Sequence, residues 1–413
     1  MKFPCKDITP LFSQFDMLYG SNSYDYQSKR YLESFEKFKQ IFGCDSCYVA
    51  SSSGRVEVLG NHTDHNGGMV ISSAISLDTL AFFLPNPDDK IRIYSEGYPE
   101  FSVDIKNFTK EGKPDSSFLV AGVFCGLQNM GYNIGGFNAY ITSNVPDGAG
   151  VSSSASFEVL IAKILSFLYN NDEIAPSDLA KVSQYSENVY FNKPCGLLDQ
   201  SAIAFGGVKL LDFSCENEII VKNCEINTEE FSFILVSTGG SHANLTDEYA
   251  SIPAEMKAVA NLFNKTRLID VSLGDILSNY KDIVLKTSDR AFLRAVHFFT
   301  ENQRVENARF SLKDGDINLF IKQVNESGLS SQCNLQNCYV SSSKEQPINR
   351  TLAIIKNIIE DGAVRVHGGG FAGCVLCVVK KSNLNAFLDN LHKYFDENSI
   401  YLLSVRKCGA IVL

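Results

Sequence analysis

The 413-residue chain has no tryptophan, no apolar run of membrane-spanning length and no GxxxxGK[ST] loop. Without an indole, any bound sugar would have to be recognised by hydrogen bonds, with help from tyrosine or phenylalanine. A bilayer span needs about 18 or more apolar residues, and the N-terminal MKFPCKDITPLF lacks the apolar core of a signal peptide. We therefore expect a cytoplasmic protein without a membrane segment. The missing loop leaves the common P-loop form of nucleotide binding without support.

Positive charge is also in the minority. The 37 lysines and arginines are outnumbered by 47 aspartates and glutamates, which gives a net charge of -10. Nucleic acids and anionic membranes are bound through an excess of positive charge, so neither is an expected partner. Small-molecule ligands are the expected partners, and we expect a monomer.

Cysteine is present but forms no clear metal or disulfide pattern. The twelve cysteines are scattered, and Cys44 and Cys47 in FGCDSCYV are the one pair with the character of an exposed CxxC. No second pair completes a zinc set. Cys374 and Cys377 are three positions apart in an expected strand, so they should point to opposite faces. We expect reduced, mostly buried thiols.

The composition is that of a folded globular protein, with 45% hydrophobic and 20% charged residues. Because a domain averages roughly 100 to 200 residues, the length predicts two domains. Strand patterns replace helical ones near residues 205–215. We therefore assign 1–208 to an N-terminal domain and 209–413 to a C-terminal domain.

Hydrophobic periodicity predicts both helices and strands along the chain. Expected helices cover 28–43, the segment that follows the serine-rich loop at 152–154, 176–191, 252–264, 290–305, 317–326 and 348–362. Expected strands cover 69–85, 90–96, 100–105, 137–146, 208–213, 218–226, 231–238, 373–380 and 401–413.

A glycine- and serine-rich loop, PDGAGVSSSA, leads directly into an expected helix. Backbone N–H groups at a helix start lack intrahelical partners and attract anions. Gly148 and Gly150 would let the chain approach a phosphate closely, and Ser152, Ser153 and Ser154 would add hydroxyl groups. Taken alone, the loop is equally consistent with an ordinary serine-capped turn.

A second polar segment, GRVEVLGNHTDHNGG at 54–68, combines one arginine, two histidines, one aspartate and four glycines. A site that distinguishes hexose epimers needs several short polar groups on a backbone that can pass close to the ring, and this segment supplies both. His62, Asp64 and His65 could alternatively bind a metal. No further conspicuous cluster of histidine or cysteine lies nearby in the sequence.

These two segments and VHGGGFAGC at 366–374 resemble the three signature motifs of the GHMP small-molecule kinases, in the same order. The 54–68 segment resembles the signature of the galactokinase family in particular. KPCGLLDQ and HFFTENQRV extend the resemblance over most of the chain. It implies an α/β (α+β) fold with an N-terminal α/β domain, a C-terminal ferredoxin-like domain, and ATP and sugar in the cleft between them.

The resemblance also implies ATP-dependent phosphorylation of the anomeric hydroxyl of a sugar, and D-galactose is the expected acceptor. Asp199 matches the family's catalytic aspartate and would accept the hydroxyl proton. Arg55 would keep that carboxylate ionised and stabilise charge on the phosphoryl group. His62 and Asp64 would bind ring hydroxyls, and Tyr249 resembles a further sugar-contacting position. The alternative for Asp199 and Arg55 is a purely structural ion pair.

For the nucleotide, the resemblance assigns the phosphates to the 148–154 loop. Mg²⁺ would be held by ATP oxygens together with Ser154 and Glu187, although a lone glutamate can equally be a solvated surface charge. Gly369 and Gly370 would shape the cleft only indirectly.

The sequence departs from the family pattern at Asn61, where the family has glutamate, and at His65, where it has tyrosine. The family's glutamate accepts a hydrogen bond from the hydroxyl on the sugar's sixth carbon, whereas a neutral asparagine can accept or donate. We expect Asn61 to contact the substrate and to relax discrimination at that carbon. Galacturonate, fucose or arabinose are therefore alternative acceptors. A non-catalytic sugar- and ATP-binding regulator is an alternative of another class, against which the presence of Arg55 and Asp199 argues.

Overall fold

The computed structural model describes residues 4–20, 23–146, 148, 150–193, 195–216, 218–224, 230–240 and 245–413. Some residues of the expected features lie outside this description, namely 147 and 149 of the serine loop, 194 of KPCGLLDQ, 225–226 of an expected strand and 241–244 before Tyr249. Two sheets, one of eight strands and one of four, organise the described chain.

The eight-stranded sheet has the order β12-β1-β2-β5-β3-β4, with β6 pairing β2 and β7 pairing β6. Its pairs are antiparallel except for β3 and β5, which are parallel. The strands are β1 (Tyr48–Leu59), β2 (Met69–Pro85), β3 (Lys90–Ser95), β4 (Phe101–Asp104), β5 (Phe137–Ser143), β6 (Val208–Asp212), β7 (Ile220–Asn223) and β12 (Ile411–Val412).

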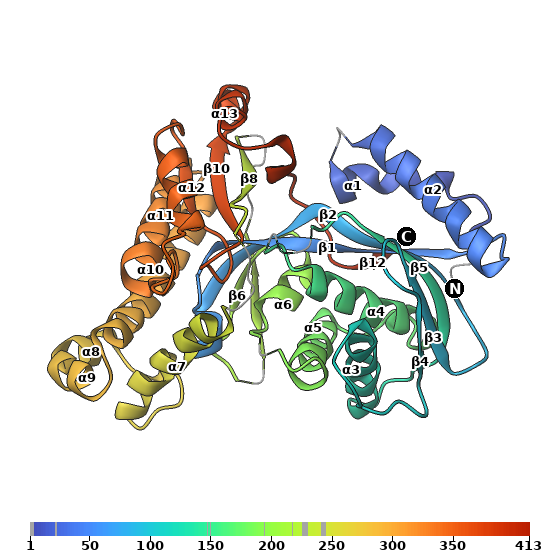
Figure 1. Ribbon diagram of the computed structural model, residues 1–413, viewed down its shortest axis with the longest axis horizontal. Coiled ribbons are helices and arrows are strands. Elements are labelled where there is room, and N and C mark those ends of the chain that lie inside the picture. The colour runs from blue at the N-terminus through green and yellow to red at the C-terminus, as the bar shows by residue number, and fades with distance from the viewer. Residues whose placement is uncertain are drawn as a thin grey trace.

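Helices cover both faces of this sheet, because alternate residues along a strand point to opposite sides. Val49 and Phe82 pack with the helices α1 (Phe15–Tyr19) and α2 (Tyr24–Phe42). Their neighbours Ala50 and Phe83 pack on the other side with helices that Figure 1 shows below the sheet. These helices are α3 (Ser116–Asn129), α4 (Ser153–Tyr169), α5 (Pro176–Tyr185) and α6 (Leu198–Phe205).

The four-stranded sheet is antiparallel and has the order β11-β8-β10-β9. Its strands are β8 (Phe231–Ser237), β9 (Ala363–Val366), β10 (Cys374–Lys380) and β11 (Ile400–Leu403). Cys374 faces the core that contains α10 (Asp289–Asp314) and α11 (Ile317–Ser330). Cys377 faces the core that contains α12 (Pro347–Lys356) and α13 (Leu384–Leu391), so the two thiols point to opposite faces as predicted.

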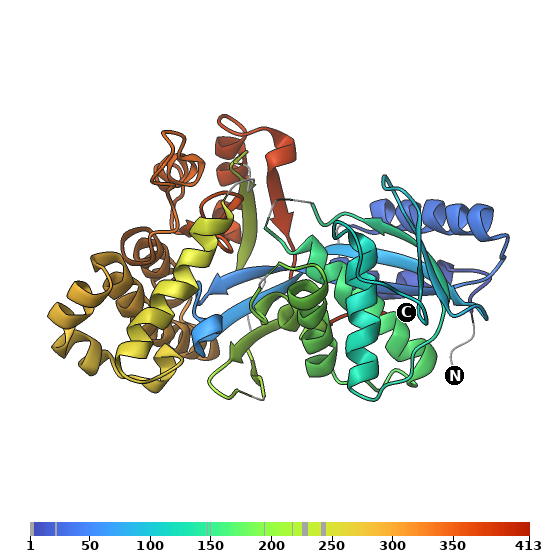
Figure 2. The ribbon, with the colours of Figure 1, turned by 60° about the horizontal axis from the view of Figure 1, so that its bottom comes forward.

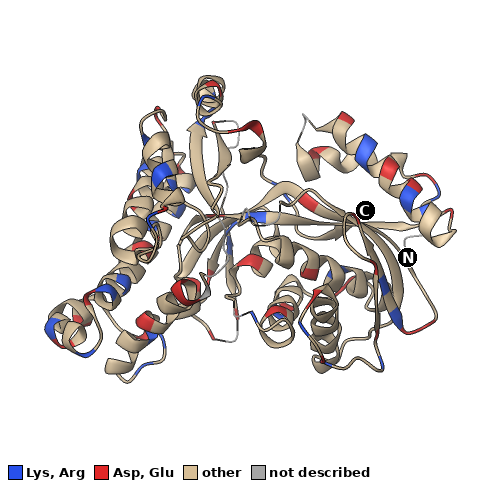
Figure 3. Ribbon diagram, in the orientation of Figure 1, with Lys and Arg blue, Asp and Glu red and all other residues tan. Residues whose placement is uncertain are grey.

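The remaining helices, α7 (Thr246–Leu262), α8 (Leu273–Ser278) and α9 (Tyr280–Lys286), lie at the end of the molecule far from β3 and β4 (Figure 2). Both acidic and basic residues lie along α2, at the other end of the molecule from these three helices (Figure 3). Within the described ranges, no helix has both the length and the apolar character of a bilayer span.

The long strands β1 and β2 connect the two parts of the molecule. Val49 and Ala50 near the start of β1 belong to the cores around the larger sheet. Val56 and Val58 near its end pack with β8, β10, α10 and α11. The segment 54–68 therefore lies at the junction between the two sheets.

Most expected elements are present, although some are shorter than predicted: the expected helix 348–362 ends at Lys356, and in the described part of the expected strand 218–226 only Ile220–Asn223 form a strand. Two further predictions were wrong in kind. The expected strand 401–413 is divided into β11 and β12, because Arg406 between them is fully buried and donates to both Ser51 and Gly409. The expected helix 176–191 becomes a π-helical turn at Ser186–Tyr190.

Candidate active site

Asp199 lies in the first turn of α6 and is held from two directions. Arg55 of β1 donates from Nε to Asp199 Oδ1 at 2.8 Å, and its Nη2 lies 2.6 Å from the same oxygen. Ser152 Oγ donates to the other oxygen, Oδ2. The Asp199 side chain is 33% exposed and that of Arg55 is 7% exposed. The Asp199 carboxylate is thus accessible to a ligand, while the buried side chain of Arg55 holds it in position.

The absence of a side chain at Gly54 allows Arg55 to reach Asp199. The register of β1 against β2 shifts between Ser53 and Arg55, and such bulges redirect side chains near functional sites. A Cβ at Gly54 would lie 2.9 Å from the carbonyl oxygen of Val151. The Arg55 N–H donates to that same carbonyl at 3.1 Å. Glycine therefore lets the serine loop pack directly against β1.

The serine loop ends at an uncapped helix. Ser152 precedes α4 with a φ of 65°, and its side chain makes no capping bond to the helix. Gly148 and Gly150 also have positive φ, 74° and 75°, and Arg55 donates to the Gly150 carbonyl. The N–H groups of Ser153 and Ser154 begin the helix, where backbone donors lack intrahelical partners. This terminus fits an anion, and the hydroxyl of Ser152 links it to Asp199.

Glu187 is buried in the π-helical turn, with only 3% of the residue exposed. Its Oε1 accepts from Ser154 Oγ at 3.1 Å and from Lys193 Nζ at 2.6 Å. Its Oε2 accepts from Gln200 at 3.1 Å. Ser154 and Glu187 therefore meet, as their expected metal role requires. Hydroxyl and carboxylate oxygens are suitable donors for Mg²⁺.

Asn61 is placed differently from the expectation. It is completely buried, and its amide nitrogen donates to Glu57 Oε1 at 2.9 Å and to the Gly368 carbonyl at 2.7 Å. Its oxygen accepts from Asn337 at 2.8 Å and from Ser331 at 3.2 Å. Because the amide's hydrogen-bonding capacity is used within the protein, none of it is free for a sugar in this arrangement.

His62 and His65 form a pair with each other. His62 has a φ of 59°, its Nδ1 lies 3.2 Å from His65 Nε2, and its Nε2 lies 3.0 Å from the Gly369 carbonyl. Burial, followed by the proximity of His65, lowers the pKa of His62 to about 3. Among the residues that the structure describes, no group of three or more histidine, cysteine, aspartate or glutamate side chains is placed to hold a metal ion, so the alternative of a metal site at His62, Asp64 and His65 has no support.

Asp64 lies beside the entry to α6. A Cβ on Gly196 would overlap Asp64 Oδ2, so glycine is required at that position. Burial raises the pKa of Asp64, while His62 opposes the rise. Asp64 lines a cavity of about 330 Å³, together with Gly196, Leu197 and residues of the segment 213–219. Of the expected catalytic and sugar-binding residues, only Asp64 is among those that line this cavity.

Tyr249, on α7, contacts the glycine-rich loop of the third motif. Its hydroxyl donates to the Gly370 carbonyl at 2.7 Å, and its ring packs against Phe371 with centroids 5.3 Å apart. A Cβ on Gly369 would lie 2.5 Å from the ring. Tyr249 thus supports the loop on which His62 also rests.

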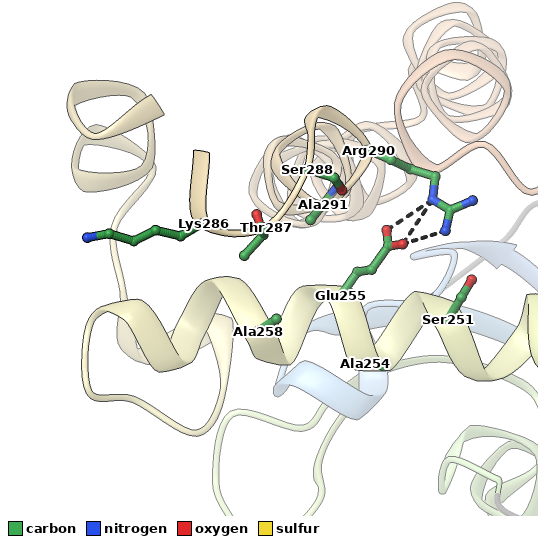
Figure 4. A pocket seen from close by; sticks show the side chains of 9 residues that line it. All are labelled: Ser251, Ala254, Glu255, Ala258, Lys286, Thr287, Ser288, Arg290 and Ala291. Atoms are coloured by element: carbon green, nitrogen blue, oxygen red, sulfur yellow. Dashed lines mark hydrogen bonds and ion pairs between the residues drawn. The ribbon is translucent and has the colours of Figure 1, made fainter. Parts of the chain in front are cut away.

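A second hollow lies away from these residues, between α7 and the start of α10. It measures about 780 Å³ and contains Glu255 and Arg290. Figure 4 shows the two side chains reaching toward one another, with Arg290 Nε 2.9 Å from Glu255 Oε1. Their opposite charges offset each other, and none of the expected site residues lines this hollow.

Sequence reasoning missed several residues that hold the site together. Glu57 of the 54–68 segment forms a buried group with Arg365 and His367, and Lys193 pairs with Glu187. Glu57 and His367 lie within quoted motifs, so their polar character in otherwise buried strands was an available signal. Lys193 begins the quoted segment KPCGLLDQ, but nothing in the sequence pairs it with Glu187.

The larger architecture agrees with known proteins at the level of fold. Residues 119–207 match the family model of the GHMP kinases N terminal domain. The mevalonate kinase of Methanococcus jannaschii superposes with a TM-score of 0.58 at 18% identity, over 86% of this chain and 98% of that one. The protein therefore has the two-domain fold of the GHMP kinases.

Within that class the similarity is narrower. Residues 36–85 match the galactokinase galactose-binding signature. Galactokinase of Clostridium acetobutylicum is 31% identical over 90% of this chain and 96% of its own length. The structure of Lactococcus lactis galactokinase complexed with galactose superposes with a TM-score of 0.79 at 26% identity, over 92% of this chain and 98% of that one. The chain belongs to the galactokinase family.

Proposed function

We propose that the protein transfers the γ-phosphoryl group of ATP to the anomeric hydroxyl of D-galactose, giving galactose 1-phosphate and ADP. One observation carries the proposal. The carboxylate of Asp199 lies between Arg55 and the hydroxyl of Ser152, at the open N-terminus of α4. Family membership supplies the identity of the two substrates.

Phosphoryl transfer requires an acceptor held in line, removal of its proton and neutralisation of charge on the moving group. In our proposal Asp199 accepts the proton of the anomeric hydroxyl as that oxygen attacks the γ-phosphorus. Arg55 holds the carboxylate in place and stabilises charge on the phosphoryl group. The start of α4, with Gly148, Gly150 and Ser152 to Ser154, binds the phosphates.

Mg²⁺ would be held by Ser154 and Glu187 and would offset negative charge on the phosphates. Asp64, which lines the 330 Å³ cavity, would bind sugar hydroxyls. His62 and Tyr249, which contact the carbonyls of Gly369 and Gly370, would contribute to sugar binding beside Asp64. The same proposal places the protein in the cytoplasm as a monomer.

The test is a coupled ADP-release assay on a panel of galactose, fucose, arabinose and galacturonate. Galactose should be the best acceptor. Asp199→Asn keeps the size of the side chain but removes the base, so turnover should fall by roughly 10²- to 10⁴-fold while galactose and ATP still bind.

Asp25→Asn, on the exposed face of α2, is the matched control and should keep full turnover. Loss of stability with turnover retained in Asp199→Asn would instead make Asp199 and Arg55 a structural ion pair. Binding of galactose and ATP by the wild type without ADP release would identify a regulator.

A further inference from the structure

The position where this chain departs from its family is built into a buried polar network. The amide of Asn61 has two N–H donors and one oxygen with two acceptor positions. Glu57 and Gly368 accept from the nitrogen, and Asn337 and Ser331 donate to the oxygen. Every hydrogen-bonding position of this side chain is filled by the protein itself.

The orientation of the amide is fixed by the chemistry of these partners. A carboxylate and a carbonyl can only accept, so they must face the nitrogen. Reversing the amide would turn its oxygen toward the Glu57 carboxylate. Glu57 is itself fixed by Arg365, which is fully buried and donates to Glu57 Oε1 at 2.9 Å and to the Val58 carbonyl at 2.8 Å.

The network connects the 54–68 segment to the glycine-rich loop of the third motif. Asn61 holds the carbonyl of Gly368, and Asn337 contacts both Asn61 and the Gly369 carbonyl, the latter at 3.2 Å. The Gly369 carbonyl in turn lies 3.0 Å from His62 Nε2. The position of His62 thus depends on a loop that Asn61 anchors.

A glutamate at this position would conflict with the network. Its carboxylate would bring a second negative charge against Glu57 in a buried site and would offer Gly368 no donor. Buried like charges and unsatisfied acceptors are costly. Asn61 and Glu57 are therefore matched to each other.

We propose that Asn61 is a positioning residue, paired with Glu57 and Arg365, which fixes the loop 368–370 and through it His62, and that it does not read the substituent on the sugar's sixth carbon. This inference rests on the proposed sugar kinase activity. It assigns discrimination at the sixth carbon to other residues. It also replaces the expectation that Asn61 itself relaxes specificity.

The test exchanges the amide and the carboxylate between the two positions. Asn61→Asp alone places two carboxylates together. Adding Glu57→Gln gives position 57 an amide that can donate to the carboxylate introduced at position 61, while its oxygen still accepts from Arg365. The double variant has the same net charge in the network as the wild type.

D-galactose and its 6-deoxy analogue, D-fucose, are compared as substrates, or as competitive inhibitors where turnover is too slow. Asn61→Asp should lower kcat/KM for galactose by roughly 10- to 100-fold, the range expected for unsatisfied buried groups. Fucose should be affected by the same factor, chiefly through KM. The double variant should recover the part of the loss that comes from placing two carboxylates together, but not the part that comes from the Gly368 carbonyl, which still lacks its donor.

The control is Asn302→Asp, another buried asparagine, whose oxygen accepts from the Met69 N–H. Glu57→Gln should not rescue it. A loss confined to galactose in Asn61→Asp would show that Asn61 reads the sixth carbon and would overturn the inference, as would absence of rescue. Thermal unfolding of the wild type, the two single variants and the double variant measures the interaction between positions 57 and 61 independently of activity. It therefore still tests the pairing if the wild type phosphorylates no sugar, and a double variant that folds where Asn61→Asp alone does not would show the same rescue.

Discussion

At the scale of single residues, the site depends on side chains whose partners come from distant parts of the chain. Arg55 and Asp199 were predicted as a pair because each lies in a quoted motif, and the structure brings them together. The environment of Asn61 could not be predicted in this way. Its partners at 331 and 337 lie outside the quoted motifs, and a hydrogen-bonded amide looks the same in sequence as a free one.

His367 should make the stability of the protein depend on pH. Its Nε2 accepts the Glu57 N–H at 3.0 Å, which requires a neutral ring. Burial lowers the pKa of His367 well below its usual range, and Arg55 and Arg365 lower it further. In the unfolded chain a histidine takes up a proton below about pH 6.5. The stability contributed by His367 is therefore complete above that pH and is lost as the pH falls.

At pH 5.5 this histidine should cost about 1 kcal/mol of unfolding free energy relative to pH 7.5. Urea unfolding at the two pH values measures the difference. His367→Gln, whose amide oxygen can still accept the Glu57 N–H, should reduce the difference by that amount. His392→Gln, at an exposed position, should leave it unchanged. An unchanged difference in His367→Gln would contradict the assignment.

At the scale of elements, period-2 and helical patterns located many segments well, and β2 has the predicted bounds, Met69–Pro85. Elements buried on all sides were harder to detect. β1 is buried along nearly its whole length and shows no alternation. Apolar residues surround α3, so no face stands out. α6 spans only eight residues, too few for a periodic signal.

The close approach of α6 to the 54–68 segment predicts a specific sensitivity at Gly196. Any Cβ there would overlap Asp64 Oδ2, so Gly196→Ala should displace Asp64. We expect the KM for galactose to rise roughly tenfold, equivalent to losing about one charge-assisted hydrogen bond. The KM for ATP should change little. Steady-state kinetics with each substrate varied in turn measure both values.

Gly274→Ala is the matched control, because the nearest atom to its Cβ would be 3.6 Å away. It should leave both KM values unchanged. An equal rise of the two KM values in Gly196→Ala would indicate general disruption instead of displacement of a sugar-binding carboxylate.

At the scale of the whole molecule, the two sheets are linked by β1 and β2 and by the C-terminal strand. β12 pairs with β1, and β6 pairs with β2. The chain therefore returns to the larger sheet in its last residues. The proposed division at residue 208 would remove β7, β12 and nearly all of β6 from that sheet.

A fragment of residues 1–208 should therefore not fold by itself. It would lose three strands of the larger sheet and expose Val56 and Val58, which pack against C-terminal elements. We expect no cooperative thermal transition by circular dichroism and rapid proteolysis, with recovery when 209–413 is co-expressed. A cooperative, protease-resistant fragment would show that residues 1–208 form an autonomous domain.

The central claim is that the Asp199 carboxylate faces both the sugar and the phosphate-binding end of α4. The most direct measurement is a crystal structure of Asp199→Asn with galactose and a non-hydrolysable ATP analogue. We predict the anomeric oxygen within hydrogen-bonding distance of residue 199 and the γ-phosphate at the N-terminus of α4. A sugar bound with its anomeric carbon turned away from residue 199, or a nucleotide bound elsewhere, would contradict the account.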